Sequence, residues 1–203
     1  MLFDTTYPNI DMRDFKNCDW KEFYGNATEA ALPDAPLPLG KELDLRLYVD
    51  SDHADDKDTR RSRTGYFIFL NSAPIVWFSK RQPTVETSVF GDEFVAMKNG
   101  MRSLRGLRYK LRMMGVPLYV PSFAYEDNIS VIHNTQRPAA VLKKKYISIC
   151  YHTCREAVAM DEILTGHIRS ENNPADLATK VLGGGAKRNV LISYLIHDFT
   201  EYF

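Results

Sequence analysis

Apolar and polar residues alternate through positions 43–50 (LDLRLYVD), which is the pattern of a strand with one buried face. Two aromatic and β-branched runs follow within residues 65–80, and the sequence NSAP between them favours a turn. Three strands joined by such short connections predict an antiparallel meander.

A helix is predicted over residues 90–114, because apolar side chains recur there at helical spacing. Its expected buried face consists of Phe94, Met97, Met101, Leu104 and Leu111. Ser88 is suited to cap its N-terminus, and Gly115 and Pro117 are suited to end it.

Strands and helices alternate in the second half of the chain. The pattern predicts strands at 121–128 and 162–169, and helices at 129–135, 146–160 and 173–182. We expect Ile149 and Val158 to be buried, and Pro174 to lie in the first turn of the last of these helices. Three antiparallel strands followed by helix-linked strands indicate an α/β fold, in which helices cover the faces of a mixed sheet.

The two ends of the chain differ from its middle, which predicts three parts. Residues 1–42 contain four prolines and form a predicted connecting arm, whose Trp20, Phe23 and Tyr24 indicate that it docks on another surface. Residues 43–182 form the predicted domain. The C-terminal part, 183–203, begins with a glycine hinge at 183–185 and contains an apolar closing helix at 189–199.

Composition excludes several classes of protein. The 26 basic and 26 acidic residues balance, so binding to nucleic acid through bulk charge alone is not expected. Three cysteines cannot all pair within the chain, which favours a reducing compartment and an intracellular, cytoplasmic location. No stretch has the length and apolar character of a membrane span, and the first residues lack the pattern of a signal peptide.

Four acids fall at the ends of predicted elements. They are Asp50 at the end of the first strand, Glu93 in the first turn of the long helix, Asp127 at the end of the fourth strand and Asp176 at the start of the helix after the fifth strand. If the first and fourth strands are neighbours, these carboxylates meet at one end of the sheet. Their repulsion would favour divalent cations such as Mg²⁺. Two such ions about 4 Å apart can promote attack of water on a phosphodiester. The simpler alternative is that each acid is a solvated loop residue or a favourable charge at a helix N-terminus.

A resemblance to the ribonuclease H region of copia-type retrotransposon Pol polyproteins is carried by YVDSDHADDKDTRRSRTGYFIFLNSAPIVWFSKRQPTVETSVFGDEFVAMK. It continues through LRGLRYKLRMMGVP, EDN, VLKKKY, YHTCREAVA and NPADLATK, and so spans nearly the whole chain. The N-terminal FDTTYPNIDMRDFKNCDWKEFYG is similar to the segment that joins the reverse transcriptase to this domain in such polyproteins.

The resemblance implies a ribonuclease H-like fold, with a five-stranded mixed sheet of three antiparallel and then two parallel strands, flanked by helices. It also implies hydrolysis of the RNA strand of RNA–DNA hybrids with two Mg²⁺ ions, or Mn²⁺ as an alternative, during reverse transcription inside a virus-like particle. The implied partners are the hybrid and the reverse transcriptase portion of the same polyprotein. By motif position, the implied catalytic and metal-binding acids are Asp50, Glu93, Asp127 and Asp176.

Several further residues are candidates for accessory roles. Asp92 is a less suitable substitute for Glu93, while Asp55 and Glu126 are additional acids beside the expected site. His167 precedes Asp176 and is a candidate accessory residue, although the pattern places it within a strand. Phosphate contacts are expected from three basic clusters, whose members are Arg60, Arg61 and Arg63, then Lys98, Arg102, Arg105 and Arg112, then Lys143, Lys144 and Lys145. A solvated helix face is the simpler alternative for the second cluster.

The sequence CYHTC offers Cys150, His152 and Cys154, but on a helix His152 points away from the two cysteines. We therefore expect small buried residues here, not a zinc site.

Two other functions compete with nuclease activity. One is a decayed or repurposed copy that binds nucleic acid or protein without cutting, which the extra acids would fit. The other is a transposase or integrase, which usually needs three acids where this chain offers four.

Overall fold

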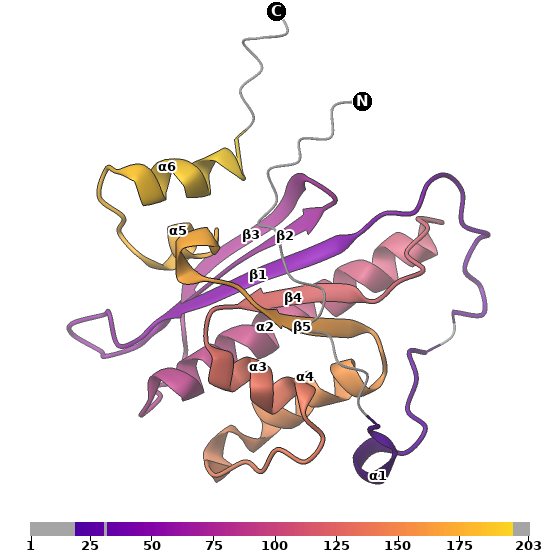
Figure 1. The fold of residues 1–203 in the computed structure, drawn as a ribbon, viewed down its shortest axis with the longest axis horizontal. Helices are drawn as coiled ribbons and strands as arrows, with labels where there is room; N and C mark the ends of the chain where they lie inside the picture. The colour runs from indigo at the N-terminus through magenta and orange to yellow at the C-terminus, as the bar shows by residue number, and fades with distance from the viewer. Residues whose placement is uncertain (1–18, 31, 197–203) are drawn as a thin grey trace, which may run out of the picture.

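The computed structural model describes residues 19–30 and 32–196, and a five-stranded sheet lies at its centre (Figure 1). The strands are β1 (Leu45–Asp52), β2 (Arg63–Leu70), β3 (Ala73–Arg81), β4 (Ser122–Glu126) and β5 (Ile163–His167). Their order across the sheet is β3-β2-β1-β4-β5. The first three strands pair antiparallel, whereas β1 with β4 and β4 with β5 pair parallel. The expected mixed sheet is confirmed.

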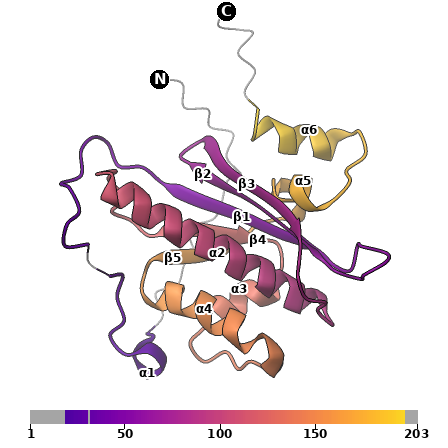
Figure 2. The ribbon, with the colours of Figure 1, turned by 180° about the vertical axis from the view of Figure 1, so that it is seen from behind.

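Helices cover both faces of this sheet. They are α1 (Lys21–Tyr24), α2 (Val89–Met113), α3 (Ile129–Gln136), α4 (Ser148–Ala159), α5 (Asp176–Thr179) and α6 (Ala186–Ser193), with 3₁₀ turns at Lys145–Ile147 and Ser170–Asn172. Figure 2 shows α2 running along one face, with α3 and α4 next to it. The short α5 packs on β1, β2 and β3, and α6 lies against α5 and the 3₁₀ turn at Ser170–Asn172.

The long helix α2 forms as its pattern predicts. The Ser88 side chain accepts a hydrogen bond from the backbone N–H of Gly91, which caps the helix start. Phe94, Met97, Met101 and Leu104 are fully buried, whereas Leu111 is only partly buried. Gly100 faces β1 so closely that an added Cβ would lie 2.7 Å from a Val49 methyl group. This contact seats α2 directly on the central strand.

The structure corrects three details of the second half. Ile149 is 80% exposed, because nine residues at 3.6 per turn place it on the opposite side of α4 from the buried Val158. Pro174 precedes α5, which is confined to Asp176–Thr179. The apolar closing helix was expected at 189–199, but α6 begins at Ala186 and ends at Ser193, and residues 197–199 lie outside the described chain.

The described part of the N-terminal arm packs against α4. Trp20 is buried, and the Arg155 guanidinium lies 4.8 Å from the centre of its ring, within range of a cation–π interaction. The Tyr24 hydroxyl is 3.0 Å from His152 Nδ1, while Phe23 remains half-exposed. The expected docking of the aromatic residues is therefore confirmed for Trp20 and Tyr24. The division of the chain at residues 42 and 182 stays a prediction.

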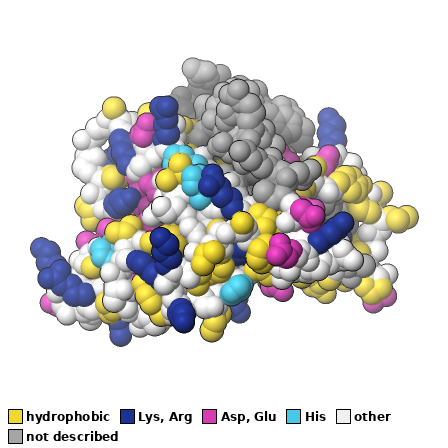
Figure 3. Space-filling model, turned by 60° about the horizontal axis from the view of Figure 1, so that its bottom comes forward, with side chains coloured by type: hydrophobic (Ala, Val, Ile, Leu, Met, Phe, Trp, Pro, Cys, Tyr) yellow, Lys and Arg dark blue, Asp and Glu magenta, His cyan; other side chains and the backbone are white. Residues whose placement is uncertain are grey.

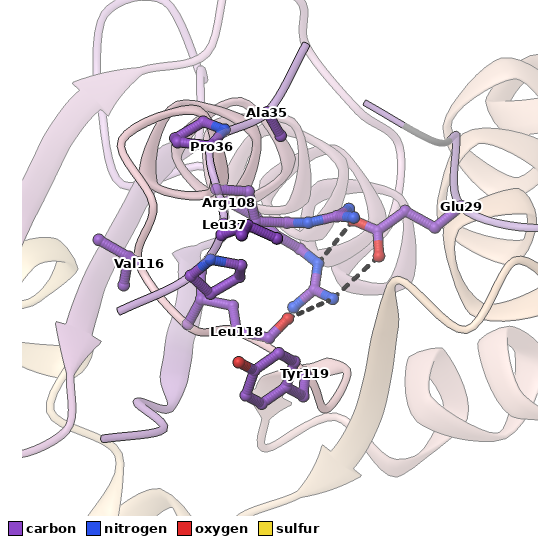
Figure 4. A pocket seen from close by; sticks show the side chains of 10 residues that line it. Glu29, Ala35, Pro36, Leu37, Arg108, Val116, Leu118 and Tyr119 are labelled. Atoms are coloured by element: carbon purple, nitrogen blue, oxygen red, sulfur yellow. Dashed lines mark hydrogen bonds and ion pairs between the residues drawn. The ribbon is translucent and has the colours of Figure 1, made fainter. Parts of the chain in front are cut away.

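A second anchor holds the arm to the end of α2 (Figure 4). Arg108 is 4% exposed and donates to both carboxylate oxygens of Glu29, over 2.7 and 2.9 Å. Its remaining donors reach the carbonyls of Val120 and Leu118, so the buried guanidinium is well satisfied. Arg112 also contacts Glu29, at 2.7 Å. Beside this anchor is a cavity of about 350 Å³, lined partly by Leu37 and Tyr119.

We expect Glu29→Ala to lower the free energy of unfolding by about 2–3 kcal/mol, because it leaves the Arg108 charge buried without its carboxylate. Urea denaturation measures this change. Glu22→Ala is the matched control, since Glu22 is an exposed acid on the same arm. Equal destabilisation by the two substitutions would contradict a specific role for the anchor.

Candidate metal centre

Three aspartates meet at one end of the sheet. Tyr48 of β1 pairs with Tyr125 of β4, and Asp50 and Asp127 each follow two residues later, so the parallel strands deliver them side by side. Asp176 is the first residue of α5, which packs over β1. One carboxylate oxygen from each aspartate lies within 4.8 Å of the other two. These three expected site residues are therefore brought together.

The fourth expected acid, Glu93, approaches from the α2 face of the sheet. It lies in the second turn of the helix, is buried, and is not one of the three carboxylates that share the 4.8 Å cluster. Burial raises its pKa well above the usual value, and the charges of Asp50 and Asp127 raise it further. Glu93 is thus electrostatically coupled to the cluster. Its neighbour Asp92 instead pairs with His53 Nδ1 and is not one of the three clustered carboxylates.

Glu126 is a fully buried acid that directly precedes Asp127. No N–H or hydroxyl group of the described residues donates to either of its oxygens. Burial, followed by the charges of Glu93 and Asp127, raises the pKa of Glu126 well above the usual value. The protonated form can donate to the Glu93 carboxylate. The sequence identified Glu126 only as an extra acid, and the structure places it where the charges of Glu93 and Asp127 act on it.

Asp50 is the electrostatic centre of the cluster. Burial raises its pKa to about 7, with a smaller contribution from the charges of Asp176 and Asp127. Two groups oppose this shift, namely the Lys180 ammonium, 3.1 Å from Asp50 Oδ1, and the Thr179 hydroxyl, which donates to Asp50 Oδ2. Crowded carboxylates with raised pKa values are the environment that a divalent cation relieves. The three converging carboxylates, together with a buried Glu93 oxygen that has no hydrogen-bond partner among the described residues, fit hard cations such as Mg²⁺.

Two lysines provide positive charge to the cluster. Lys180 Nζ lies 2.6 Å from Asp176 Oδ1 and so bridges Asp176 and Asp50. Lys187, in the first turn of α6, pairs with the other oxygen of Asp176. Neither lysine was predicted from the sequence as a member of the site. The spacing of four residues between Asp176 and Lys180 is a recognisable signal for a helical ion pair, whereas nothing local in the sequence connects Lys187 to Asp176.

The expected phosphate-binding residues have different environments. Five of them are exposed, namely Arg60, Arg61, Arg102, Lys143 and Lys145, whereas Lys144 is partly buried. Lys144 lies 5.7 Å from the centre of the Phe90 ring, Arg63 donates to the Ser79 hydroxyl over 3.4 Å, and Arg105 pairs with Glu162. Lys98 is partly buried near Cys150. Figure 3, which turns the lower side of Figure 1 towards the viewer, shows basic side chains spread among acidic and apolar ones on that face. Their role in binding nucleic acid stays a prediction.

The remaining candidates are engaged in local contacts. His167 ends β5, and its Nε2 lies 3.1 Å from the backbone carbonyl of Asp127, next to the cluster. Its accessory role stays a prediction. In CYHTC, Cys154 is fully buried and Cys150 partly buried, both as free thiols, while His152 contacts Tyr24.

No helix within residues 19–30 and 32–196 is long and apolar enough to cross a membrane.

Comparison with solved structures agrees with this architecture. The complex of LC11-RNase H1 with an RNA/DNA hybrid superposes with a TM-score of 0.52 at 14% identity, covering 66% of this chain and 93% of that one. RNase H1 from the archaeon Halobacterium salinarum gives a TM-score of 0.51 at 10% identity, covering 66% of this chain and 93% of that one. At these identities the comparison establishes the fold alone. The chain has a ribonuclease H-like fold.

Sequence comparison identifies the relatives. The retrovirus-related Pol polyprotein from transposon RE1 of Arabidopsis thaliana is 31% identical over 153 residues, which are 75% of this chain but 10% of that protein. The Pol polyprotein from transposon TNT 1-94 of Nicotiana tabacum is 31% identical over 144 residues, 70% of this chain and 11% of that protein. No protein-family model matches. The chain is homologous to a segment of transposon Pol polyproteins, about a tenth of their length, and fits their ribonuclease H domain.

Proposed function

We propose that this chain is a metal-dependent endonuclease that hydrolyses the RNA strand of RNA–DNA hybrids during reverse transcription of a copia-type retrotransposon. The convergence of Asp50, Asp127 and Asp176 within 4.8 Å, at the shared end of two parallel strands, carries this proposal. The homology to Pol polyproteins supports it, as does the fold shared with a ribonuclease H that was crystallised with a hybrid.

Each side chain of the site has a proposed role that follows from its position. Asp50, Asp127 and Asp176 would hold the divalent cations, and Glu93 would complete the set from α2. Two bound Mg²⁺ ions, or Mn²⁺ in their place, would supply activation of the attacking water and stabilisation of the leaving oxygen. A protonated Glu126 beside Glu93 would limit the negative charge of the site, since burial raises the pKa of Glu126 well above its usual value. The exposed bases would contact phosphates of the hybrid, and the products would carry a 5′-phosphate and a 3′-hydroxyl.

The polyprotein context extends the proposal to partners and location. The reverse transcriptase portion of the same polyprotein is the proposed covalent partner, and an intracellular virus-like particle is the proposed location. The similarity of the N-terminal arm to the connecting segment of such polyproteins supports the first of these. Packing of Trp20 and Glu29 on the domain would then fix the path of the connection.

Cleavage of a labelled hybrid tests the proposal. We expect the RNA strand to be cut in Mg²⁺ or Mn²⁺ and not in EDTA, with double-stranded DNA left intact. Asp127→Asn should lose this activity, because it removes the negative charge of one of the three clustered carboxylates with little change in side-chain shape. Cleavage that persists in EDTA, or equal cleavage by wild type and variant, would show that the assigned acids are wrong.

A binding protein without nuclease activity is the second candidate. The observation that favours it is the occupation of the carboxylates by ammonium groups, since Lys180 and Lys187 both contact Asp176. Such a protein would bind the hybrid with the same affinity in Mg²⁺ and in EDTA, and would not cut it. Electrophoretic mobility shifts, measured alongside the cleavage assay, separate the two functions.

A further inference from the structure

Helix α6 is tied to the metal centre through a single side chain. Lys187, in its first turn, reaches Asp176, whose carboxylate is fully buried, while the lysine side chain itself is 40% exposed. The opposite oxygen of Asp176 is occupied by Lys180 at 2.6 Å. Both oxygens of this proposed metal ligand therefore accept an ammonium group, and a cation that binds Asp176 must compete with at least one of them.

The two lysines differ in how they are held. Lys180 follows α5 directly and contacts Asp50 as well as Asp176, so it is part of the cluster itself. Lys187 comes from a separate helix, beyond three consecutive glycines at 183–185. At each of these glycines an added Cβ would have no atom within 4 Å. The three glycines are surrounded by open space on the side where a side chain would lie, so the start of α6 can move without a clash there.

We propose that α6 is an intramolecular strap that closes the metal-free site, in which Lys187 and a divalent cation compete for Asp176. This inference rests on the proposed function, because it takes the acid cluster to be a metal centre. Lys187 stabilises the buried carboxylate while no metal is present. When a metal ion binds, it neutralises Asp176 in place of the Lys187 ammonium, and the start of α6 is released. Leu191, which is fully buried, keeps the remainder of the helix attached.

If Lys187 and a divalent cation exclude each other from Asp176, each must weaken the binding of the other, because coupling between two binding events is reciprocal. Removing the Lys187 charge should tighten metal binding, and adding metal should loosen the start of α6. Arg188 provides a matched control, because it lies on the same helix and carries the same charge but is exposed and forms no ion pair among the described residues. A general change in the electrostatic field would affect both variants alike.

The experiment uses isothermal titration of Mg²⁺ into the full chain, free of nucleic acid, for wild type, Lys187→Gln and Arg188→Gln. We expect Lys187→Gln to bind Mg²⁺ about threefold or more tightly than wild type, as the loss of a partly exposed ion pair allows. Arg188→Gln should remain close to wild type. Amide hydrogen exchange of the wild type supplies a readout that needs no variant. The amides of residues 189–192, which form the first hydrogen bonds of α6, should exchange faster once Mg²⁺ is bound.

The outcomes separate the strap from the nuclease proposal. Equal affinities of the two variants, or Mg²⁺ binding that leaves the exchange of residues 189–192 unchanged, would overturn the strap while leaving the metal centre in place. If none of the three proteins binds Mg²⁺, the metal centre itself is wrong and the strap is overturned with it. A tighter Lys187→Gln variant together with faster exchange in the wild type supports the proposal.

Discussion

Asp50→Asn is expected to reduce hybrid cleavage in Mg²⁺ at least about 10³-fold, because a catalytic metal ion contributes several kcal/mol to transition-state stabilisation. Asp50 contributes an oxygen to the three-aspartate cluster and is flanked by the charges of Asp127 and Asp176, so its loss weakens the centre of the site. Single-turnover cleavage of a labelled hybrid measures the effect. Asp58→Asn is a suitable control, since Asp58 is an exposed acid in the loop after β1. A variant that retains wild-type cleavage would remove Asp50 from the mechanism.

The same substitution is expected to stabilise the metal-free fold at high pH. The folded pKa of Asp50 is about 7, whereas its ordinary value is 3.8, so between these values the folded state binds more protons than the unfolded state. Stability in EDTA should therefore fall as the pH rises from about 4 to 7 and stay low above that window. Lys180 remains protonated throughout this range and adds no slope of its own, because its pKa is raised from 10.5.

Asparagine cannot ionise, so Asp50→Asn should lack this part of the pH dependence. At pH 8 the variant should be more stable than wild type in EDTA, by at most roughly 4 kcal/mol, and at pH 4 the two should be similar. Urea denaturation at the two pH values gives the comparison. Lower stability of the variant at pH 8 would mean that the contacts of Asp50 with Lys180 and Thr179 outweigh the cost of its burial.

Local patterns were sufficient to predict the elements and the position of the acids. The alternation in LDLRLYVD marks the position of β1, and the spacing of Phe94, Met97 and Met101 marks α2. The expectation of one buried face was wrong, because β1 is the central strand and is buried on both faces. Asp50 and Asp127 could be placed together because strands that run parallel bring their C-terminal ends to one edge of a sheet. Both predictions depend on periodicity within one element or on the order of elements, which the sequence contains.

Contacts between distant side chains could not be predicted in the same way. The pairing of Lys187 with Asp176 depends on where α6 settles after three glycines, and the pairing of Glu29 with Arg108 depends on the path of the arm. The proximity of Glu126 to Glu93 arises from packing of α2 across the end of β4. Burial inside α4 was also misjudged at Ile149, because an apolar residue does not reveal which side of a helix has a neighbour.

The position of α5 depends on a glycine that the sequence analysis did not identify. Gly65 of β2 pairs directly with Asp50 of β1. An added Cβ at Gly65 would lie 2.5 Å from the Thr179 methyl group and 3.1 Å from the carbonyl carbon of Ala178. The second of these atoms belongs to the backbone, so a side chain here must shift α5 itself. The same helix supplies Asp176 and the Thr179 hydroxyl that donates to Asp50.

Gly65→Val is therefore expected to displace α5 and to separate Asp176 from Asp50 and Asp127 while the sheet remains folded. Hybrid cleavage should fall about 10²-fold or more, since a displacement of about 1 Å can have this effect on a catalytic group. Mg²⁺ affinity, measured by titration calorimetry, should fall with it. The control is Gly106→Ala in α2, where an added Cβ meets no atom within 4 Å, and this change should preserve cleavage and stabilise the helix by about 1 kcal/mol. If Gly65→Val retained both cleavage and Mg²⁺ affinity, the close packing of α5 on β2 would not be needed to assemble the site.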